Sequence, residues 1–219
     1  MRWVVILAIV VVGVSMAQTS DQTSWEDLLF PNEEQIKEAC DRGYEAGEKG
    51  ERQGLLVLGM ALRFLELTPL TINGVDAVSV ALPLASVYFQ CSSQASELLP
   101  KDYNKAIISA RHILVGLHGV AANLDAAKSW ATAIALEGGG SELVRVQPIG
   151  KSLGELKNWK TDCSRGGTLC VVKGVNFYTF LVDPFRKVAN KGERLALLFN
   201  IGNGVNRVAF TPLDFVVGR

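Results

Sequence analysis

Residues 194–210, RLALLFNIGNGVNRVAF, contain two apolar runs on either side of a turn signal. The dipeptide Asn203-Gly204 is preferred in two-residue type I′ turns, which join adjacent antiparallel strands. With Gly202 placed opposite Val205, the predicted pairs are Phe199 with Val208 and Leu197 with Phe210. One face of the hairpin is then apolar, with Leu195, Leu197, Phe199, Ile201, Val208 and Phe210. A shift of one residue would expose this face, so the pattern predicts a hairpin that is buried on one side.

Further strand patterns fill the second half of the chain. The segments with short apolar or alternating patterns are residues 112–117, 130–136, 143–147, 171–182 and 214–217. The sequence Gly138-Gly139-Gly140-Ser141 lies between two of them and predicts a second hairpin with a glycine turn. The run that ends before Pro184 carries apolar side chains on both faces, so we expect both of its faces to be covered. The last run would extend the sheet after Pro212.

The first half of the chain is predicted to be mainly helical. Asn32 and Gln35 have the spacing of a capping box, so a helix should begin after Pro31 and end near Gly50. The other elements expected here are a buried strand over 55–67 and helices over 73–99 and 101–111. Pro83 falls within the second of these helices and should either kink it or mark its true start.

These elements together predict an α+β fold, in which N-terminal helices pack on a C-terminal antiparallel, sandwich-like β-sheet region. The strand and turn pattern resembles that of Ig-like and fibronectin-like sandwiches, a resemblance that implies the fold alone. No Pro/Ser-rich linker divides the chain. Residues 31–219 are therefore expected to form a single α+β domain, helix-rich over 31–111 and strand-rich over 112–219.

Residues 1–17 have the order of a secretory signal peptide. Arg2 precedes an apolar run, and the small residues Ser15 and Ala17 precede a predicted cleavage site before Gln18. The rival interpretation is an uncleaved anchor, but the apolar run is shorter than the roughly 20 residues that span a bilayer. We expect a secreted or periplasmic protein with no transmembrane segment after signal cleavage. Residues 18–30 are predicted to be a flexible polar N-terminus.

The composition is typical of a globular protein with balanced charge. Its 219 residues include 22 basic and 22 acidic side chains, and 48% of the residues are hydrophobic. Loss of the leader would remove Arg2 and leave a net charge of about −1, whereas nucleic-acid-binding domains usually carry a basic excess. Binding to nucleic acid, or to a membrane surface through basic residues, is therefore not expected.

Four cysteines remain in the predicted mature chain: Cys40, Cys91, Cys163 and Cys170. An even number of cysteines in an exported protein favours disulfides. Gly166-Gly167 can form a turn between the two closest cysteines, so we favour Cys163–Cys170, which leaves Cys40 with Cys91. A pairing between the two halves of the chain stays open. A zinc site or a thioredoxin-type redox site is disfavoured, because CxxC spacing and nearby histidines are lacking.

The predicted mature chain has two histidines, His112 and His118. Six residues apart, they share one face of a strand but lie about 120° apart around a helix. The predicted strand would therefore point both side chains to the same side. We interpret one as a side chain at the edge of the core and the other as a loop residue, because a metal pair would also need carboxylates from elsewhere.

No GxSxG, HExxH, Walker-type loop or dinucleotide fingerprint occurs in the sequence. Ser164 beside Cys163 has no partnered histidine in the sequence. Structural roles suffice for the other candidates. Gly138-Gly139-Gly140, Asp162 and Asp214 are interpreted as turn residues, Asp183-Pro184 as a strand end and Glu33-Glu34 as a helix start. Trp130, Trp159, Tyr178 and Phe180 are expected in the core. We assign no catalytic, cofactor-binding or metal-ligating residue and expect no cofactor.

These features predict an exported, non-catalytic protein that binds a partner or has a structural role in the cell envelope or extracellular space. The expected partner is another envelope or extracellular protein, and the edge of the final hairpin could accept a strand from it. One alternative is a secreted hydrolase with a site assembled from scattered residues. The other is a protein that binds a small apolar ligand between its helices and its sheet. The sequence leaves the specific ligand and the oligomeric state open.

Overall fold

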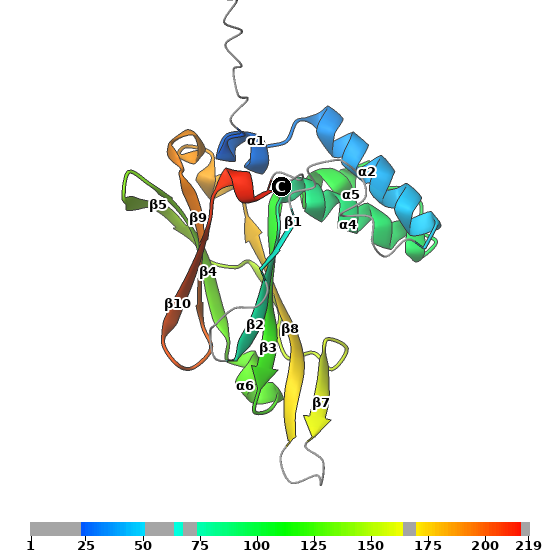
Figure 1. The fold of residues 1–219 in the computed structure, drawn as a ribbon. Helices are drawn as coiled ribbons and strands as arrows, with labels where there is room; N and C mark the ends of the chain where they lie inside the picture. The colour runs from blue at the N-terminus through cyan, green and yellow to red at the C-terminus, as the bar shows by residue number, and fades with distance from the viewer. Residues whose placement is uncertain (1–22, 51–63, 68–73, 164–169, 216–219) are drawn as a thin grey trace, which may run out of the picture.

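The computed structural model describes residues 23–50, 64–67, 74–163 and 170–215 and shows an α+β fold with two antiparallel, sandwich-like sheets (Figure 1). The fold class predicted from the sequence is thereby confirmed. The predicted signal peptide at residues 1–17 lies outside the described residues. None of the helices in the described ranges has the length and apolar character needed to cross a membrane.

The larger sheet has six strands within the described residues, in the order β1-β2-β3-β8-β6, and β7 also pairs with β8. Their bounds are β1 Phe64–Leu67, β2 Val75–Ala81, β3 His112–Ala121, β6 Gly150–Ser152, β7 Trp159–Cys163 and β8 Cys170–Leu181. The long strands β3 and β8 pair along their length, from His112 opposite Leu181 to Ala121 opposite Val172. This pair forms the centre of the sheet.

The smaller sheet has four strands in the described part of the chain, in the order β10-β9-β4-β5. Their bounds are β4 Ala131–Gly138, β5 Ser141–Val146, β9 Arg194–Asn200 and β10 Val205–Phe210. The glycine-turn hairpin predicted around residues 138–141 is formed by β4 and β5. Strand β10 lies at an edge, as expected for the last strand of a final hairpin.

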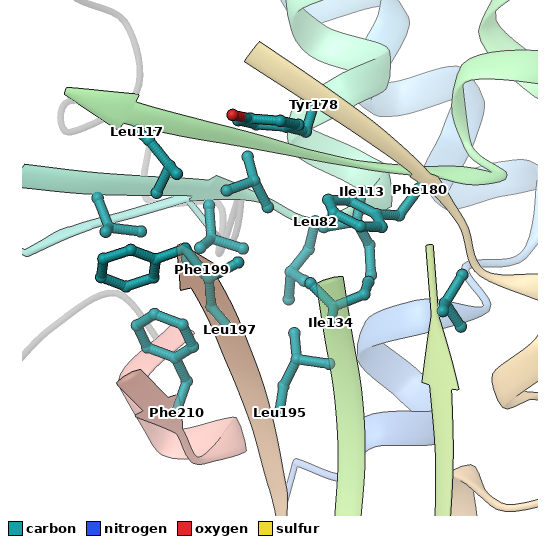
Figure 2. Packing of buried hydrophobic residues seen from close by; sticks show 14 of the residues in the cluster. Leu82, Ile113, Leu117, Ile134, Tyr178, Phe180, Leu195, Leu197, Phe199 and Phe210 are labelled. Atoms are coloured by element: carbon teal, nitrogen blue, oxygen red, sulfur yellow. The ribbon is translucent and has the colours of Figure 1, made fainter. Parts of the chain in front are cut away.

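The core lies between the two sheets (Figure 2). Strand β3 contributes alternate residues, Ile113, Val115 and Leu117, all of which are fully buried. The facing sheet contributes buried side chains in the same alternating manner, among them Ile134, Leu195, Leu197, Phe199 and Phe210. The interdigitation of two apolar faces explains why the hairpin pattern at residues 194–210 specifies which side faces inward.

The register predicted for that hairpin is wrong by two residues. Val205 pairs with Asn200 and Val208 pairs with Leu197, so four residues rather than two connect the strands. Gly202 and Gly204 adopt positive φ values of 104° and 101°, and these two glycines make the turn. A shift of two residues keeps every side chain on its face, so the predicted apolar face stays buried.

Three helices form a separate layer, made of α2 (Glu33–Glu48), α4 (Pro83–Ser96) and α5 (Tyr103–Ser109). Figure 1 shows this layer on the side of the six-stranded sheet that faces away from the smaller sheet. The predicted capping box is confirmed, since Asn32 Oδ1 accepts a hydrogen bond from the Gln35 backbone N–H and Gln35 Oε1 accepts one from the Asn32 N–H. The layer has its own buried cluster, which includes Ala39, Val87 and Ala106.

The helix predicted over residues 73–99 begins too early. Its first part is strand β2, in which Val78 and Val80 are buried against the facing sheet, and the valine-rich sequence suits a pleated strand. Pro83 occupies the first turn of α4, so it marks the true start of the helix. The region called helix-rich, 31–111, therefore also contains β1 and β2. The predicted strand over 55–67 is described only at its end, as β1.

Both ends of the described chain differ from the prediction. Within the segment 18–30, read as a flexible polar N-terminus, helix α1 (Trp25–Leu29) buries Trp25, Leu28 and Leu29 completely. The segment read as a last strand instead forms a short 3-10 helix, η3 (Pro212–Phe215). The Phe215 ring lies edge-on to Trp25, with centroids 5.8 Å apart. The polar composition of residues 18–30 gave no indication that three side chains of α1 belong to the core. At the other end, Pro212 has no backbone N–H to pair, so strand β10 does not continue beyond it.

The remaining short elements are α6 (Leu124–Lys128), η1 (Asp183–Phe185) and η2 (Ala189–Lys191). Helix α6 follows β3 and packs near β8 through a buried amide. Asn176 Nδ2 donates to the carbonyl oxygen of Ala127 at 2.7 Å, and Asn176 Oδ1 accepts from the N–H of Gly154 and from Trp159 Nε1. This fully buried asparagine joins three segments inside the core.

Candidate functional site

A groove of about 420 Å³ lies between the helical layer and the outer face of the six-stranded sheet. We call it the α4–α5 groove. Its lining residues are Ser86, Phe89, Gln90 and Ser93 of α4, Ile108 and Ser109 of α5, His112 and Leu114 of β3, and Thr179 of β8. Figure 1 shows α4 and α5 beside the same end of this sheet. Three elements that follow one another in sequence and the distant strand β8 therefore build one concavity.

The position of the groove follows from two short connections. Helix α4 starts directly after β2, and α5 leads into β3 within three residues of Ser109. Ser86 Oγ donates a hydrogen bond to the His112 carbonyl oxygen at 3.2 Å, which ties α4 to the beginning of β3. In β3, the residues that alternate with the buried Ile113 face the helices, so His112 and Leu114 reach the groove.

Four polar side chains of the groove make no hydrogen bond to any other described residue. They are Gln90, Ser109, His112 and Thr179, and all four are partly exposed. The two remaining hydroxyl groups are used within the protein, because Ser86 bonds the β3 backbone and Ser93 Oγ donates to Glu97 Oε1 at 2.7 Å. The groove thus presents hydrogen-bonding groups that a ligand can satisfy.

The lining of the groove is uncharged near neutral pH. Partial burial, together with the positive charge of Arg111, lowers the pKa of His112 below its usual value of 6.5, although Asp183 opposes this effect. His112 is therefore a neutral imidazole at pH 7, with one donor and one acceptor nitrogen. Arg111 is itself paired with Asp183. No other lining side chain is ionisable in this pH range.

A second polar pair lies further along the same face of the sheet. Ser79 Oγ of β2 and His118 Nε2 of β3 are 3.0 Å apart, within hydrogen-bond distance. Gly116 leaves room for this pair, because a Cβ at that position would lie 2.4 Å from Ser79 Oγ. The pair has the atoms of a nucleophile and a base. However, β2 is paired on both sides, with β1 and β3, so the ladders use the backbone N–H groups beside Ser79.

The two histidines lie on one face of β3, in agreement with the strand prediction. Six residues of strand separate them by about 20 Å along β3, so they do not form a pair. Neither is a loop residue, and that part of the interpretation is wrong: His112 lines the groove and His118 contacts Ser79. Within the described ranges, no group of three or more His, Cys, Asp or Glu side chains could hold a metal ion.

The other candidate residues have structural surroundings. The aromatic residues Trp130, Trp159, Tyr178 and Phe180 are all buried in the core. The three aspartates Asp162, Asp183 and Asp214 contact Lys173, Arg111 and Thr211, respectively. Gly138, Gly139 and Gly140 belong to the β4–β5 hairpin, and Glu33 and Glu34 begin α2. Ser164 lies outside the described residues.

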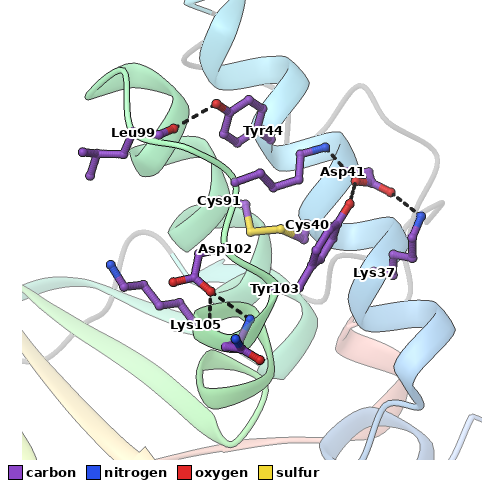
Figure 3. Close-up of a disulfide and its surroundings, with 11 residues drawn as sticks. Lys37, Cys40, Asp41, Tyr44, Cys91, Leu99, Asp102, Tyr103 and Lys105 are labelled. Atoms are coloured by element: carbon purple, nitrogen blue, oxygen red, sulfur yellow. Dashed lines mark hydrogen bonds and ion pairs between the residues drawn. A yellow bond between two sulfur atoms is a disulfide. The ribbon is translucent and has the colours of Figure 1, made fainter.

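Two disulfides join the four cysteines in the pairs that the sequence favours. Cys40–Cys91 links α2 to α4 and is fully buried (Figure 3). Cys163–Cys170 links residues that are directly paired between β7 and β8, and both are exposed. Beside the first disulfide, Asp41 of α2 accepts hydrogen bonds from Lys37, Lys101 and Tyr103 (Figure 3).

Most of the polar residues of both sites could not be identified from the sequence. The predicted helix over 73–99 includes Ser79 and would not place it beside His118. Only the strand pattern of β2 indicates that Ser79 lies next to His118. Gln90, Ser109 and Thr179 are ordinary polar residues on three separate elements, and no spacing connects them. Only the packing of α4 and α5 on the sheet brings them together.

No family model, no curated protein and no solved structure matches the chain. The structure itself describes the protein as an α+β sandwich with a helical layer and an uncharged, hydrogen-bonding groove.

Proposed function

We propose that this protein is an exported, non-catalytic binding protein that acts in the periplasm, the cell envelope or the extracellular space, and that it binds its partner in the α4–α5 groove. One observation carries the proposal: four polar side chains without hydrogen bonds to other described residues line one cavity of ligand size. Ligand pockets are commonly about 300–1,000 Å³ and contain a few such converging polar groups.

The proposed location rests on two independent features. Residues 1–17 have the composition of a signal peptide. All four cysteines are joined in disulfides, which persist in oxidising compartments and are rare in the cytosol. Intact mass of the protein recovered from its native envelope or medium provides the test. The proposal predicts a chain that starts at Gln18 without free thiols, and a full-length chain with four thiols would contradict it.

A crosslinking experiment tests the binding site. A photoreactive amino acid is placed at Gln90 in the groove, at Val205 on the edge strand β10, or at the exposed residue Asp125 of α6. The three variants are expressed in the native host and irradiated. We expect a discrete adduct from Gln90 and none from Asp125. An adduct from Val205 alone would instead support strand addition at the sheet edge and contradict the groove.

The hydrolase alternative rests on the 3.0 Å contact between Ser79 and His118. Acyl transfer also needs donors that stabilise an oxyanion, and the ladders on both sides of β2 already use the nearby backbone N–H groups. A fluorophosphonate probe, with the Ser79→Ala variant as control, separates the two functions. The proposed binding function predicts no labelling, whereas labelling that disappears in Ser79→Ala would favour a hydrolase.

The apolar-ligand alternative is less well supported by the lining of the groove. A cavity does lie between helices and sheet, where this alternative expects one. Its walls, however, combine three apolar side chains with six polar residues. An apolar ligand would displace water from these polar groups without replacing its hydrogen bonds.

A further inference from the structure

We propose that the α4–α5 groove recognises a neutral, hydroxyl-rich ligand, namely a saccharide unit, either free or carried on a larger glycan. This inference rests on the proposed binding function and names the chemistry of its ligand. It follows from three properties of the lining: its lack of charge, its uncommitted hydrogen-bonding groups and its apolar side chains.

The absence of charge argues against ionic ligands. His112 is neutral at pH 7, and the other eight lining residues carry no formal charge. Two charged groups next to lining residues are already engaged, because Arg111 pairs with Asp183 and Glu97 accepts a hydrogen bond from Ser93. An anionic or cationic ligand would lose part of its hydration in the groove without gaining an ion pair.

The uncommitted groups match hydroxyl chemistry. Ser109 and Thr179 each offer a donor and an acceptor, Gln90 offers both through its amide, and neutral His112 offers one of each. A sugar hydroxyl also donates and accepts, so it can pair with any of these four groups. A ligand that lacks such groups would leave them without partners, which a hydrogen-bonding site penalises strongly.

The apolar residues of the groove complete the match. Phe89, Ile108 and Leu114 lie among the polar residues, and Ile108 is 57% exposed. A pyranose ring has hydroxyl groups around its rim and C–H groups on its faces. The C–H face can lie against apolar side chains, and an aromatic ring attracts positively polarised edges. A lining that combines polar and apolar side chains therefore suits a sugar ring better than a purely apolar chain.

The test is an NMR titration of the ¹⁵N-labelled mature protein with defined probes. Maltotriose and N,N′,N″-triacetylchitotriose are the neutral saccharides, trigalacturonate is the charged saccharide and laurate is the apolar ligand. We expect one or both neutral saccharides to shift amide signals of α4, α5 and β3 at concentrations up to about 10 mM, typical of weak single-site binding. Trigalacturonate and laurate should produce no such shifts.

Variants locate the binding site. Thr179→Val and Gln90→Leu should each weaken neutral-saccharide binding about three- to tenfold, because each removes hydrogen bonds to the ligand. Thr161→Val makes the same substitution as Thr179→Val on the exposed strand β7 and should bind like the wild type. Equal affinity of Thr179→Val and Thr161→Val would show that the saccharide binds elsewhere and would overturn the assignment.

Two outcomes separate this inference from the proposed function. If neither neutral saccharide shifts the groove signals while Gln90 still crosslinks a partner, the saccharide assignment is wrong and the binding function stands. Binding of laurate alone would likewise overturn the assignment. If a saccharide binds, periodate oxidation of the partner before irradiation distinguishes its source: loss of the Gln90 adduct indicates a glycan on that partner, and an unchanged adduct shows that the saccharide is not carried on that partner.

Discussion

The backbone of α2 at Gly43 lies directly against the backbone of α4 at Tyr88. A Cβ added to Gly43 would lie 2.3 Å from the Tyr88 carbonyl oxygen, and one added to Gly47 would lie 2.3 Å from the Ser92 carbonyl oxygen. These two glycines, one helical turn apart, allow α2 to approach α4 closely beside the Cys40–Cys91 disulfide. They therefore position α4, which forms one wall of the groove.

Substitution of Gly43 by alanine should destabilise the helical layer. The added methyl group improves helix propensity by about 1 kcal/mol, but it must push two backbones apart, and overpacking costs about 1–3 kcal/mol or more. We expect a net loss of about 1–2 kcal/mol in the free energy of unfolding, measured by urea denaturation. Gly150→Ala is the control, because its Cβ would lie 3.5 Å from Thr179. Equal stability of the two variants would contradict the close helix packing.

The two disulfides should differ in stability and in reactivity. Cys40–Cys91 spans 51 residues and Cys163–Cys170 spans 7, so loop entropy predicts losses of about 4 and 2.5 kcal/mol on removal of each bond by paired alanine substitutions. Since the first bond is buried and the second is exposed, a reductant should attack Cys163–Cys170 first. Alkylation and mass mapping during stepwise reduction measure the order. Earlier alkylation of Cys40 and Cys91 would contradict this account.

Replacement of Asn176 by alanine should destabilise the core. The substitution leaves three buried groups without their partner: the Gly154 N–H, Trp159 Nε1 and the Ala127 carbonyl oxygen. Each unsatisfied buried group costs about 1–3 kcal/mol, and we expect a total loss of about 3–5 kcal/mol in unfolding free energy. Asn104→Ala on the exposed side of α5 should change stability by less than about 0.5 kcal/mol. A tolerated Asn176→Ala would show that the amide is not needed.

Acid should weaken the contact between α2 and α5. Partial burial disfavours the charged form of Asp41, but hydrogen bonds from Lys101, Tyr103 and Lys37 outweigh it and lower the pKa of Asp41 from 3.8 to about 2. A lowered pKa contributes stability that is complete above the unfolded pKa and is lost as the pH falls through the folded pKa. The relevant window is therefore about pH 4 to 2.

Asp41→Asn should remove this contribution. Asp41 is 36% exposed, so solvent screening limits the effect to about 1 kcal/mol or less. The difference in unfolding free energy between the wild type and Asp41→Asn should shrink as the pH falls from about 5 to 2. Urea denaturation at several pH values provides the measurement. A difference that stays constant over this range would rule out ionisation of Asp41 as its cause.

Local patterns in the sequence predicted the parts of the fold that depend on neighbouring residues. The capping box at Asn32 and the inward face of the final hairpin are examples. The Asn203-Gly204 signal alone led to the wrong register, because Gly202 also adopts a positive φ and four residues form the turn. Distant packing decided elsewhere, since the facing sheet makes a strand of the segment that includes Ser79. In α1, a polar context concealed buried Trp25.

The candidate site was less predictable than the fold. His112 and His118 could be placed on one strand face from their spacing alone. Gln90 and Thr179 could not be related, because 89 residues separate them and neither belongs to a motif. A groove whose lining is divided among four elements leaves no local signature in the sequence. Its chemistry emerges only when the elements are packed.

Filling the groove tests its role as the binding site most directly. Ser109→Trp would place an indole ring in the α4–α5 groove, and Asp125→Trp would place one on exposed α6. Both variants are first shown to fold by circular dichroism, then immobilised beside the wild type, and the partner that crosslinks at Gln90 is quantified on each. Loss of the partner from Ser109→Trp, with wild-type retention by Asp125→Trp, is the predicted result. Equal retention by all three proteins would contradict binding in the groove.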